Sequence, residues 1–202
     1  MIRVSYRSDR FLARVLPRSF QSDLRLYQHL SNKPWWRLMV QSEGLWVLVL
    51  FRLIQALDAS PLNRNVRRVM GIPLRITYRL MCMFVGIALP TKTGLAPGLH
   101  ISHGGAIVIH PEAVIGPHCF ITHQVTLGIA GNDERRGVPT VGRGVYIGAG
   151  AKIIGKVTIG DYAKIGANAV VTKDIPSKAV AVGVPATVIG YQEPDPVLLA
   201  EA

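Results

Sequence analysis

Large aliphatic residues return at every sixth position over two stretches of the chain. The positions are Ile109, Ile115, Ile121 and Leu127, and then Val141, Ile147, Ile153, Ile159, Ile165 and Val171. Glycine directly follows many of them, and a smaller apolar residue comes four places later. A period of six matches neither an α-helix nor the alternation of a single strand, and it predicts a repeat architecture. We expect each unit to direct its aliphatic side chain inward and to turn at the glycine, so that three units close one triangular coil.

Two interruptions of the repeat mark places where side chains leave the coil. Between Ile101 and Ile109 the step is eight residues rather than six, and the extra residues fall around the SHGG segment, residues 102–105. Between Leu127 and Val141 the step is fourteen, which predicts an ejected polar loop over about residues 129–140. Loops that leave a regular scaffold often carry function.

The part of the chain before the repeat has the pattern of helices. We expect a short helix over 23–30, a long apolar helix over 34–57 and a third helix over about 62–70. Pro73 is expected to break or kink the chain before the apolar stretch 74–85, because proline removes a helical hydrogen bond.

The positive charge of the chain is concentrated before the repeat. The whole chain carries 23 Lys and Arg against 12 Asp and Glu, a net charge of +11. Residues 1–90 hold 14 basic and 4 acidic residues, a balance of +10 (14 − 4). These charges and the Trp35–Trp36 pair favour a peripheral contact with an anionic membrane surface, and helices that only pack on the solenoid are the alternative. No nucleic-acid recognition motif accompanies the charge, so we expect no nucleic-acid partner.

The predicted organisation is a helical N-terminal region over 1–88, a repeat domain over 89–191 and a C-terminal tail over 192–202. Cys82 and Cys119 are too few for a disulfide framework, and we see no cleavable signal segment. No apolar run reaches the roughly 20 residues that span a bilayer. We therefore expect a cytoplasmic protein, with the inner face of the cell membrane as its place of contact.

The segments IGAGAKIIG, IGANAVVTKDIP and GVPATVIG resemble the hexapeptide-repeat acyltransferases. Their order is most similar to serine O-acetyltransferase and its relatives from bacterial polysaccharide gene clusters, and the similarity covers about residues 86–191. The resemblance implies a mainly β protein, with a left-handed parallel β-helix behind an α-helical N-terminal part. It also implies an enzyme that uses acetyl-CoA, assembles as a homotrimer and needs no metal.

Histidine chemistry and the resemblance together single out His103 as the catalytic base. An imidazole with a pKa near 6.5 can take the proton of an alcohol and later return it to a leaving thiolate. The segment GLHISHGGAIVI resembles the part of serine acetyltransferases that carries their catalytic histidine, which falls at His103. For coenzyme A, the resemblance implies a groove along the small residues at Ala149 and Ala167, with Lys152 and Lys173 meeting the phosphates.

The resemblance breaks down at positions that orient the base and bind serine. The family's orienting acid falls at Ala88, and the acid before the histidine is replaced by Ser102. The family's Arg–His pair falls at Gly137–Val138, with Arg135 and Arg136 close by but shifted. We assign Ser102, Arg135 and Arg136 to acceptor binding. The remaining candidates for the orienting acid are Glu112, Asp133 and Glu134.

These departures decide the expected acceptor. We favour a hydroxyl of a polysaccharide or sugar precursor, with free L-serine as the runner-up. A zinc enzyme of the γ-class carbonic anhydrase type is an alternative, because His118 and His123 are spaced H-x4-H and His100 lies one coil length earlier. An inactive scaffold is a further alternative, because of Ala88.

Overall fold

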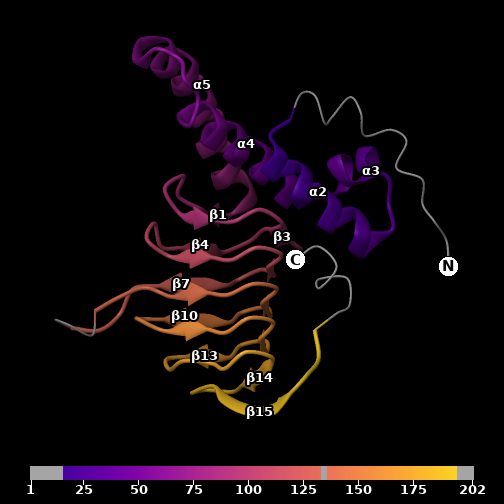
Figure 1. Ribbon diagram of the computed structural model, residues 1–202, viewed down its shortest axis with the longest axis vertical. Helices are drawn as coiled ribbons and strands as arrows, with labels where there is room; N and C mark the ends of the chain where they lie inside the picture. Colours follow the sequence, from indigo (N-terminus) through magenta and orange to yellow (C-terminus); the bar gives the residue numbers. More distant parts are fainter. Residues whose placement is uncertain (1–15, 133–135, 195–202) are drawn as a thin grey trace.

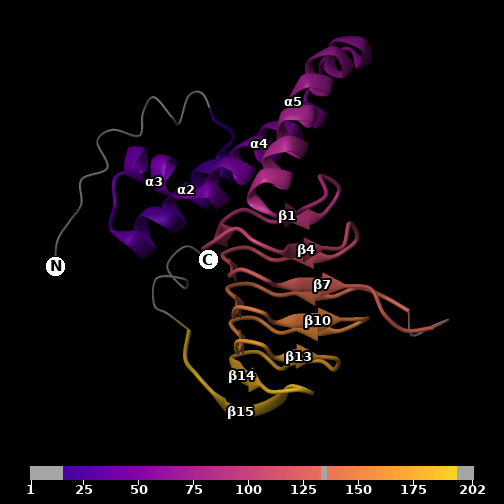
Figure 2. The same ribbon diagram turned by 180° about the vertical axis from the view of Figure 1, so that it is seen from behind.

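The computed structural model describes residues 16–132 and 136–194. Its helices come first: α2 (Arg18–Ser31), α3 (Trp35–Gln41), α4 (Glu43–Asp58) and α5 (Arg64–Val85). The strands follow, and Figures 1 and 2 show them stacked as a column with the helices at one end. Mostly parallel sheets behind N-terminal helices confirm the expected fold class at that level.

The long helix expected over 34–57 is broken into α3 and α4. Ser42 has an extended backbone between them, and the two helices are bent by 103°. The break brings the first turn of α4 against the solenoid. A Cβ at Gly44 would lie 2.6 Å from the carbonyl oxygen of Ile101, so only glycine fits at this contact.

Pro73 lies inside α5 and does not break it, so the helix that was expected to end near residue 70 continues. Proline leaves the carbonyl four residues earlier without its helical partner. That residue is Val69, which is 71% exposed and lies on the outer face of the helix, and the helix continues to Val85.

The strands of the described chain form three sheets, and each sheet takes every third strand around the coil up to β13, after which β14 and β15 both join the third sheet. The first sheet contains β1 (Ile87–Ala88), β4 (Ile107–Ile109), β7 (Thr126–Gly128), β10 (Lys152–Ile154) and β13 (Val170–Val171). The second contains β2 (Gly94–Leu95), β5 (Val114–Ile115), β8 (Thr140–Val141) and β11 (Thr158–Ile159). The third contains β3 (His100–Ile101), β6 (Phe120–Ile121), β9 (Tyr146–Ile147), β12 (Lys164–Ile165), β14 (Ala179–Val182) and β15 (Thr187–Tyr191).

The register of these sheets stacks the sixth-position aliphatic residues on one another. Ile109 pairs with Leu127, Ile115 with Val141, and Ile121 with Ile147. These side chains are buried, as the repeat predicts. All neighbouring strands run parallel except β14 and β15, whose antiparallel pairing lies at the end of the column (Figure 1).

Two corners of this triangular column matter for function. The histidine edge joins the third sheet to the first and consists of residues 102–106, 122–125, 148–151 and 166–169. The loop edge joins the first sheet to the second and consists of residues 110–113, 129–132, 136–139, 155–157 and 172–174. The first sheet therefore lies between the two edges.

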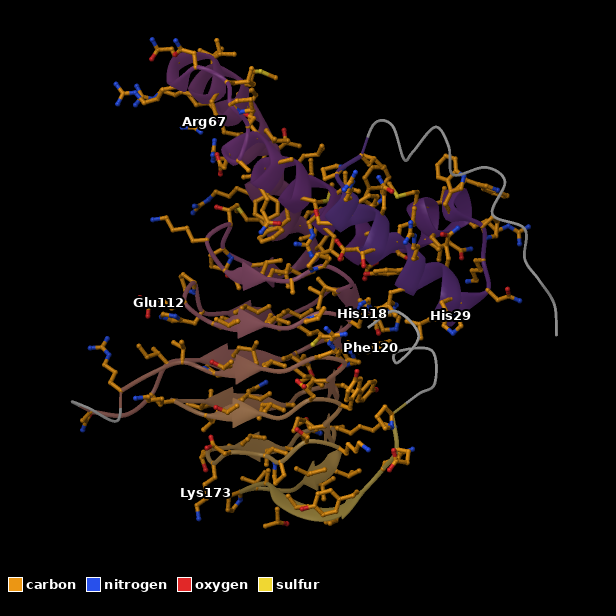
Figure 3. The ribbon with its side chains drawn as sticks, in the orientation of Figure 1. His29, Arg67, Glu112, His118, Phe120 and Lys173 are labelled. Carbon is orange, nitrogen blue, oxygen red and sulfur yellow. The ribbon has the colours of Figure 1, made fainter. Side chains whose placement is uncertain are left out.

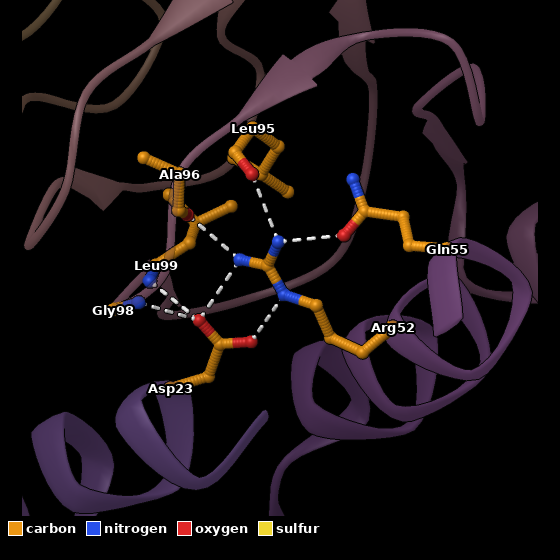
Figure 4. Close-up of polar contacts among 7 residues, drawn as sticks. All are labelled: Asp23, Arg52, Gln55, Leu95, Ala96, Gly98 and Leu99. Carbon is orange, nitrogen blue, oxygen red and sulfur yellow. Dashed lines mark hydrogen bonds and ion pairs between the residues drawn. The ribbon is translucent and has the colours of Figure 1, made fainter. Parts of the chain in front are cut away.

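A buried ion pair fastens the helices to the first coil (Figure 4). Arg52 of α4 donates from Nε and Nη2 to the Asp23 carboxylate of α2, at 2.8 and 3.1 Å. The same guanidinium donates to the carbonyls of Leu95 and Ala96, and the Asp23 carboxylate accepts from the N–H groups of Gly98 and Leu99. Arg52 is 1% exposed and Asp23 is fully buried, so both charges depend on these partners.

Tyr27 of α2 makes a second contact with the solenoid. Its hydroxyl donates to the carbonyl of Ile101 at 2.7 Å and accepts from the N–H of the same residue at 2.9 Å. Its ring lies 4.1 Å from the ring of His100, which in turn packs near Phe120. Burial, with a smaller contribution from His103, lowers the pKa of His100 to about 4.

None of the helices in the described chain is by itself long and apolar enough to cross a membrane. Taken together, α3 and α4 reach the required length and hydropathy, but only as the pair bent by 103°. The apolar side chains of α4 are largely used in the core, where Leu45, Leu48 and Phe51 are fully buried.

We expect the Asp23→Ala substitution to lower the free energy of unfolding by about 3–5 kcal/mol, because it leaves the Arg52 charge buried without its partner. Denaturant unfolding followed by circular dichroism gives this quantity. The double variant Asp23→Ala/Arg52→Met should recover part of the loss, since no charge stays buried. Asp58→Ala, which breaks the exposed Arg75–Asp58 pair, is the control and should cost less than about 1 kcal/mol. An Asp23→Ala protein as stable as this control would contradict the account.

We expect His100 to make the protein less stable in acid. Its folded pKa of about 4 lies below that of the unfolded chain, near 6.5. Between these values the unfolded chain binds a proton that the folded chain excludes, so the free energy of unfolding falls as the pH falls. His100→Phe keeps the ring packing and removes the titration, so its stability should fall less between pH 7 and pH 4 than that of the wild type, by roughly the proton linkage. His29→Gln, at an exposed position, should follow the wild-type curve. Identical curves for His100→Phe and wild type would contradict the prediction.

Candidate functional site

His103 lies on the histidine edge, directly after β3, with its side chain exposed. Both helix ends next to it hold the segment that follows. The N–H of Gly104 donates to the Glu43 carboxylate of α4 at 2.9 Å, and the N–H of Gly105 donates to the Val85 carbonyl of α5 at 2.8 Å. The two extra residues of this coil are therefore fixed by the helices, and His103 projects from a defined backbone.

The glycines of the SHGG segment are required by this docking. A Cβ at Gly104 would lie 2.4 Å from Val85 Cγ1 and 2.6 Å from the Val85 carbonyl oxygen. Gly105 has a φ of +98°, which L side chains rarely adopt. The sequence irregularity is thus the place where the helices meet the coil.

His123 stands beside His103, one coil further along the same edge. The two ring centroids are 6.2 Å apart and the rings meet edge to face, at 67°. The N–H of Gln124 donates to the Gly105 carbonyl at 2.8 Å, which holds the two corners in register. From its spacing in the sequence, His123 was expected only as a possible zinc ligand, so its place beside the candidate base was missed. Counting the repeat from the SHGG segment would have placed His123 at the next corner of the same edge, and so beside His103.

The histidine edge continues through the small residues expected at the coenzyme groove. The N–H of Gly150 donates to the His123 carbonyl at 3.0 Å, and the N–H of Asn168 donates to the Ala149 carbonyl at 2.7 Å. Ala149 and Ala167 therefore occupy the same edge as His103, on later coils. Lys152, at the start of β10, donates from Nζ to the Gln124 carbonyl. The structure places His103, Ala149 and Ala167 on one edge, and Lys152 lies beside that edge at the start of β10.

The other predicted residues lie elsewhere in the chain. Lys173 is on the loop edge, and Figure 3 shows it and Glu112 on the side of the column away from His118. Arg136 belongs to the loop between β7 and β8, on the loop edge as well. Within one chain the first sheet separates these side chains from His103. Arg135, Asp133 and Glu134 fall outside the described residues.

Ser102 was expected to bind the acceptor, and Ala88 takes the position of the family's orienting acid. The Ser102 hydroxyl lies 3.2 Å from Nδ1 of His100, within hydrogen-bond distance. Ala88 lies on β1, exposed, beside a groove of about 770 Å³ between α5 and the first sheet. Tyr78, Cys82 and Met83 line the helical side of this groove. Among the described residues that line it, none is acidic, so the groove supplies no substitute for the missing carboxylate.

The described residues do not support the zinc alternative. His100 packs against Tyr27 on the third sheet, His118 lies at the corner between the second and third sheets, and His123 lies on the histidine edge. Across residues 16–132 and 136–194, no group of three or more His, Cys, Asp or Glu side chains could hold a metal ion. The H-x4-H spacing places its two histidines at opposite ends of one strand, β6.

Both cysteines are buried free thiols. Burial raises the pKa of Cys82, and it raises the pKa of Cys119 to about 12. Neither thiol is a thiolate near neutral pH, and only a thiolate acts as a nucleophile or metal ligand. We therefore assign both cysteines to packing.

Comparison with known proteins gives a consistent family. Residues 139–173 match the family described as bacterial transferase hexapeptide (six repeats). The serine acetyltransferase of Helicobacter pylori strain 26695 is 34% identical over 169 residues, which cover 84% of this chain and 94% of that protein. The serine acetyltransferase of Synechococcus elongatus is 36% identical over 148 residues, which cover 72% of this chain but only 60% of the relative.

Solved structures of serine acetyltransferases share the fold. The Brucella abortus strain S19 enzyme in complex with coenzyme A has a TM-score of 0.73 at 26% identity, covering 88% of this chain and 68% of that one. The Neisseria gonorrhoeae enzyme in complex with serine has a TM-score of 0.68 at 29% identity, covering 84% and 67%.

These matches overturn the expected polysaccharide or sugar acceptor. The relatives that match over most of the chain are serine acetyltransferases, the function that the sequence analysis placed second. The expectation was wrong because the missing serine-binding pattern at Ser102, Gly137 and Val138 was given more weight than the arrangement of the whole repeat. The chain belongs to the serine acetyltransferase family, whose members are hexapeptide-repeat acetyltransferases.

Proposed function

We propose that this protein transfers the acetyl group of acetyl-CoA to the hydroxyl of L-serine. One observation carries the proposal: His103 projects from the histidine edge on a backbone held by Glu43 and Val85, in line with the small residues Ala149 and Ala167. The similarity to serine acetyltransferases over 84% of the chain supports the acceptor. Coenzyme A and serine bound to solved relatives support both substrates.

His103 is proposed as the base. Its imidazole accepts the proton of the serine hydroxyl while the oxygen attacks the thioester carbonyl. The carbon–sulfur bond then breaks, and the imidazolium returns the proton to the sulfur of coenzyme A. The products are O-acetylserine and free coenzyme A, and no other reactant is consumed.

Coenzyme A is proposed to lie along the histidine edge. Small side chains at Ala149 and Ala167 let its pantetheine arm approach the backbone, and Lys152 lies beside this strip to meet a phosphate. Lys173 lies on the loop edge, so in this proposal it meets coenzyme A only when a second copy brings its loop edge to the groove.

We infer a left-handed coil and a homotrimer, by similarity to the family. Arg136 and Lys173 lie across the first sheet from His103 in one chain. Three copies around one axis, each with its first sheet toward the axis, set the loop edge of one copy against the histidine edge of the next. Arg136 then serves the acceptor carboxylate of a neighbouring site, as a guanidinium suits a carboxylate. We also propose a cytoplasmic location, which the two free thiols and the proposed substrates support.

Acetyl-CoA and L-serine should suffice for turnover. Release of the coenzyme A thiol is followed with a thiol reagent, with L-serine and with free sugars as separate acceptors. We expect serine-dependent release and only background release with sugars. Thiol release that does not depend on serine, with pure folded protein, would overturn the proposed acceptor.

We expect His103→Ala to lower kcat by about 10²–10⁴, the usual contribution of a positioned acid–base group. The dissociation constant of coenzyme A, measured by calorimetry, should change little because the proposed groove lies on later coils. His29→Ala, an exposed histidine on α2, is the matched control and should keep wild-type rates. Full activity of His103→Ala would show that His103 is not the base.

Filling the groove should block the coenzyme specifically. Ala149→Trp and Ala167→Trp should each weaken coenzyme A binding by at least tenfold, or about 1.4 kcal/mol, since the bulky ring occupies the space of the pantetheine arm. Val114→Trp places the same ring on an exposed position of the second sheet and should leave binding unchanged. Wild-type coenzyme A affinity in both alanine variants would place the groove elsewhere.

A further inference from the structure

Helix α5 exposes an unusual number of large apolar side chains. Those that are at least 46% exposed are Val66, Val69, Met70, Ile72, Ile76, Leu80, Met83 and Phe84. Phe84 alone is 90% exposed. Single exposed apolar residues are ordinary, but a contiguous set on one element marks an interaction site.

These side chains share one sector of the helix. Steps of three, four or seven residues place five of these side chains on one face of the helix: Val66, Val69, Ile76, Leu80 and Met83. The opposite sector faces the core, where Gly71, Tyr78 and Cys82 are buried. We call the exposed set the apolar sector of α5. Figures 1 and 2 show the helix rising away from the column, so the solenoid does not cover this sector.

The charge of α5 is of one sign. The helix contains Arg64, Arg67, Arg68, Arg75 and Arg79, and its sequence has no acidic residue. At 100° per residue, Arg68, Arg75 and Arg79 fall between the core-facing sector and the apolar sector, and we call these three residues the arginine flank. Arg75 pairs with Asp58 and Arg67 donates to the Asp58 carbonyl, whereas Arg64, Arg68 and Arg79 are exposed. Figure 3 labels Arg67 near the end of the helix farthest from the solenoid.

We infer that α5 docks on an anionic phospholipid surface. The apolar sector enters the boundary between headgroups and acyl chains, and the arginine flank meets lipid phosphates. An arginine-rich helix with one apolar face is the form that lies in the plane of a membrane interface. Charge complementarity favours this occupant over a second copy of the chain, because two such helices would bring their arginines together without an opposing charge.

This assignment moves the membrane contact away from the residues that the sequence suggested. Trp35 packs against the core, and Trp36, which is 52% exposed, lies under Arg37 rather than in an apolar patch. The first residues of the basic N-terminus lie outside the described residues. The inference does not depend on the identity of the acceptor, so it stands or falls separately from the proposed function.

Co-sedimentation of the full chain with vesicles tests the inference. We expect binding to vesicles that contain phosphatidylglycerol at low salt, weaker binding at high salt, and no binding to pure phosphatidylcholine. Ile76→Glu/Leu80→Glu should reduce binding at least tenfold. Val114→Glu/Ile189→Glu makes the same charge change at exposed apolar positions of the solenoid and should keep binding.

The arginine flank has its own test. Arg68→Gln/Arg79→Gln should weaken binding about 30-fold, which is about 2 kcal/mol at about 1 kcal/mol for each arginine near the surface. Circular dichroism confirms that each variant is folded. Wild-type protein that ignores anionic vesicles, or an Ile76→Glu/Leu80→Glu variant that still binds them, overturns the inference. Light scattering gives a further contradicting result. If the Ile76→Glu/Leu80→Glu variant changes its molar mass but still binds vesicles, the apolar sector is a contact between copies of the chain.

Discussion

The buried pair of Asp23 and Arg52 is the contact on which the rest of the molecule depends. It joins α2 to α4, and through the carbonyls of Leu95 and Ala96 and the N–H groups of Gly98 and Leu99 it joins both helices to the first coil. Burial raises the pKa of Asp23, while the guanidinium and the two N–H groups oppose that shift. A buried pair of this kind adds little net stability, but the loss of either partner is costly. It therefore fixes where the helices sit.

That placement determines the candidate site. Once α2 and α4 are fixed, Tyr27 bonds both backbone groups of Ile101, and Glu43 receives the N–H of Gly104. Val85, at the end of α5, receives the N–H of Gly105. His103 lies between these anchors. A regular coil would have carried the histidine on a plain corner, whereas here the two extra residues are used to dock helices and to aim the side chain out of the column.

The solenoid could be predicted from the sequence because its constraint is local and repeated. One aliphatic residue in six, followed by glycine, sets both the turn and the register, and the pairs such as Ile121 with Ile147 follow from it. The helical part could not be predicted to the same depth. Arg52 reads as an interruption of an apolar run, and its partner Asp23 is 29 residues away with no periodic relation.

The candidate site was predictable in part for the same reason. Positions on the repeat, such as Ala149 and Ala167, fall on one edge by counting. His123 was assigned to a metal because spacing along the chain does not show which corner a residue occupies. Arg136 and Lys173 were grouped with residues that the first sheet separates from them in one chain. The acceptor was misjudged because single missing side chains were read without the surrounding architecture.

The central claim is that the helices hold His103, the proposed base, in place, and Tyr27→Phe tests it most directly. The substitution removes one oxygen and leaves the N–H and carbonyl of Ile101 without their buried partner. In protein shown to be folded, we predict that kcat/KM for L-serine falls tenfold or more, because small misplacements of a reacting group are costly. Coenzyme A affinity should be retained. A folded Tyr27→Phe protein with wild-type kcat/KM would contradict the claim.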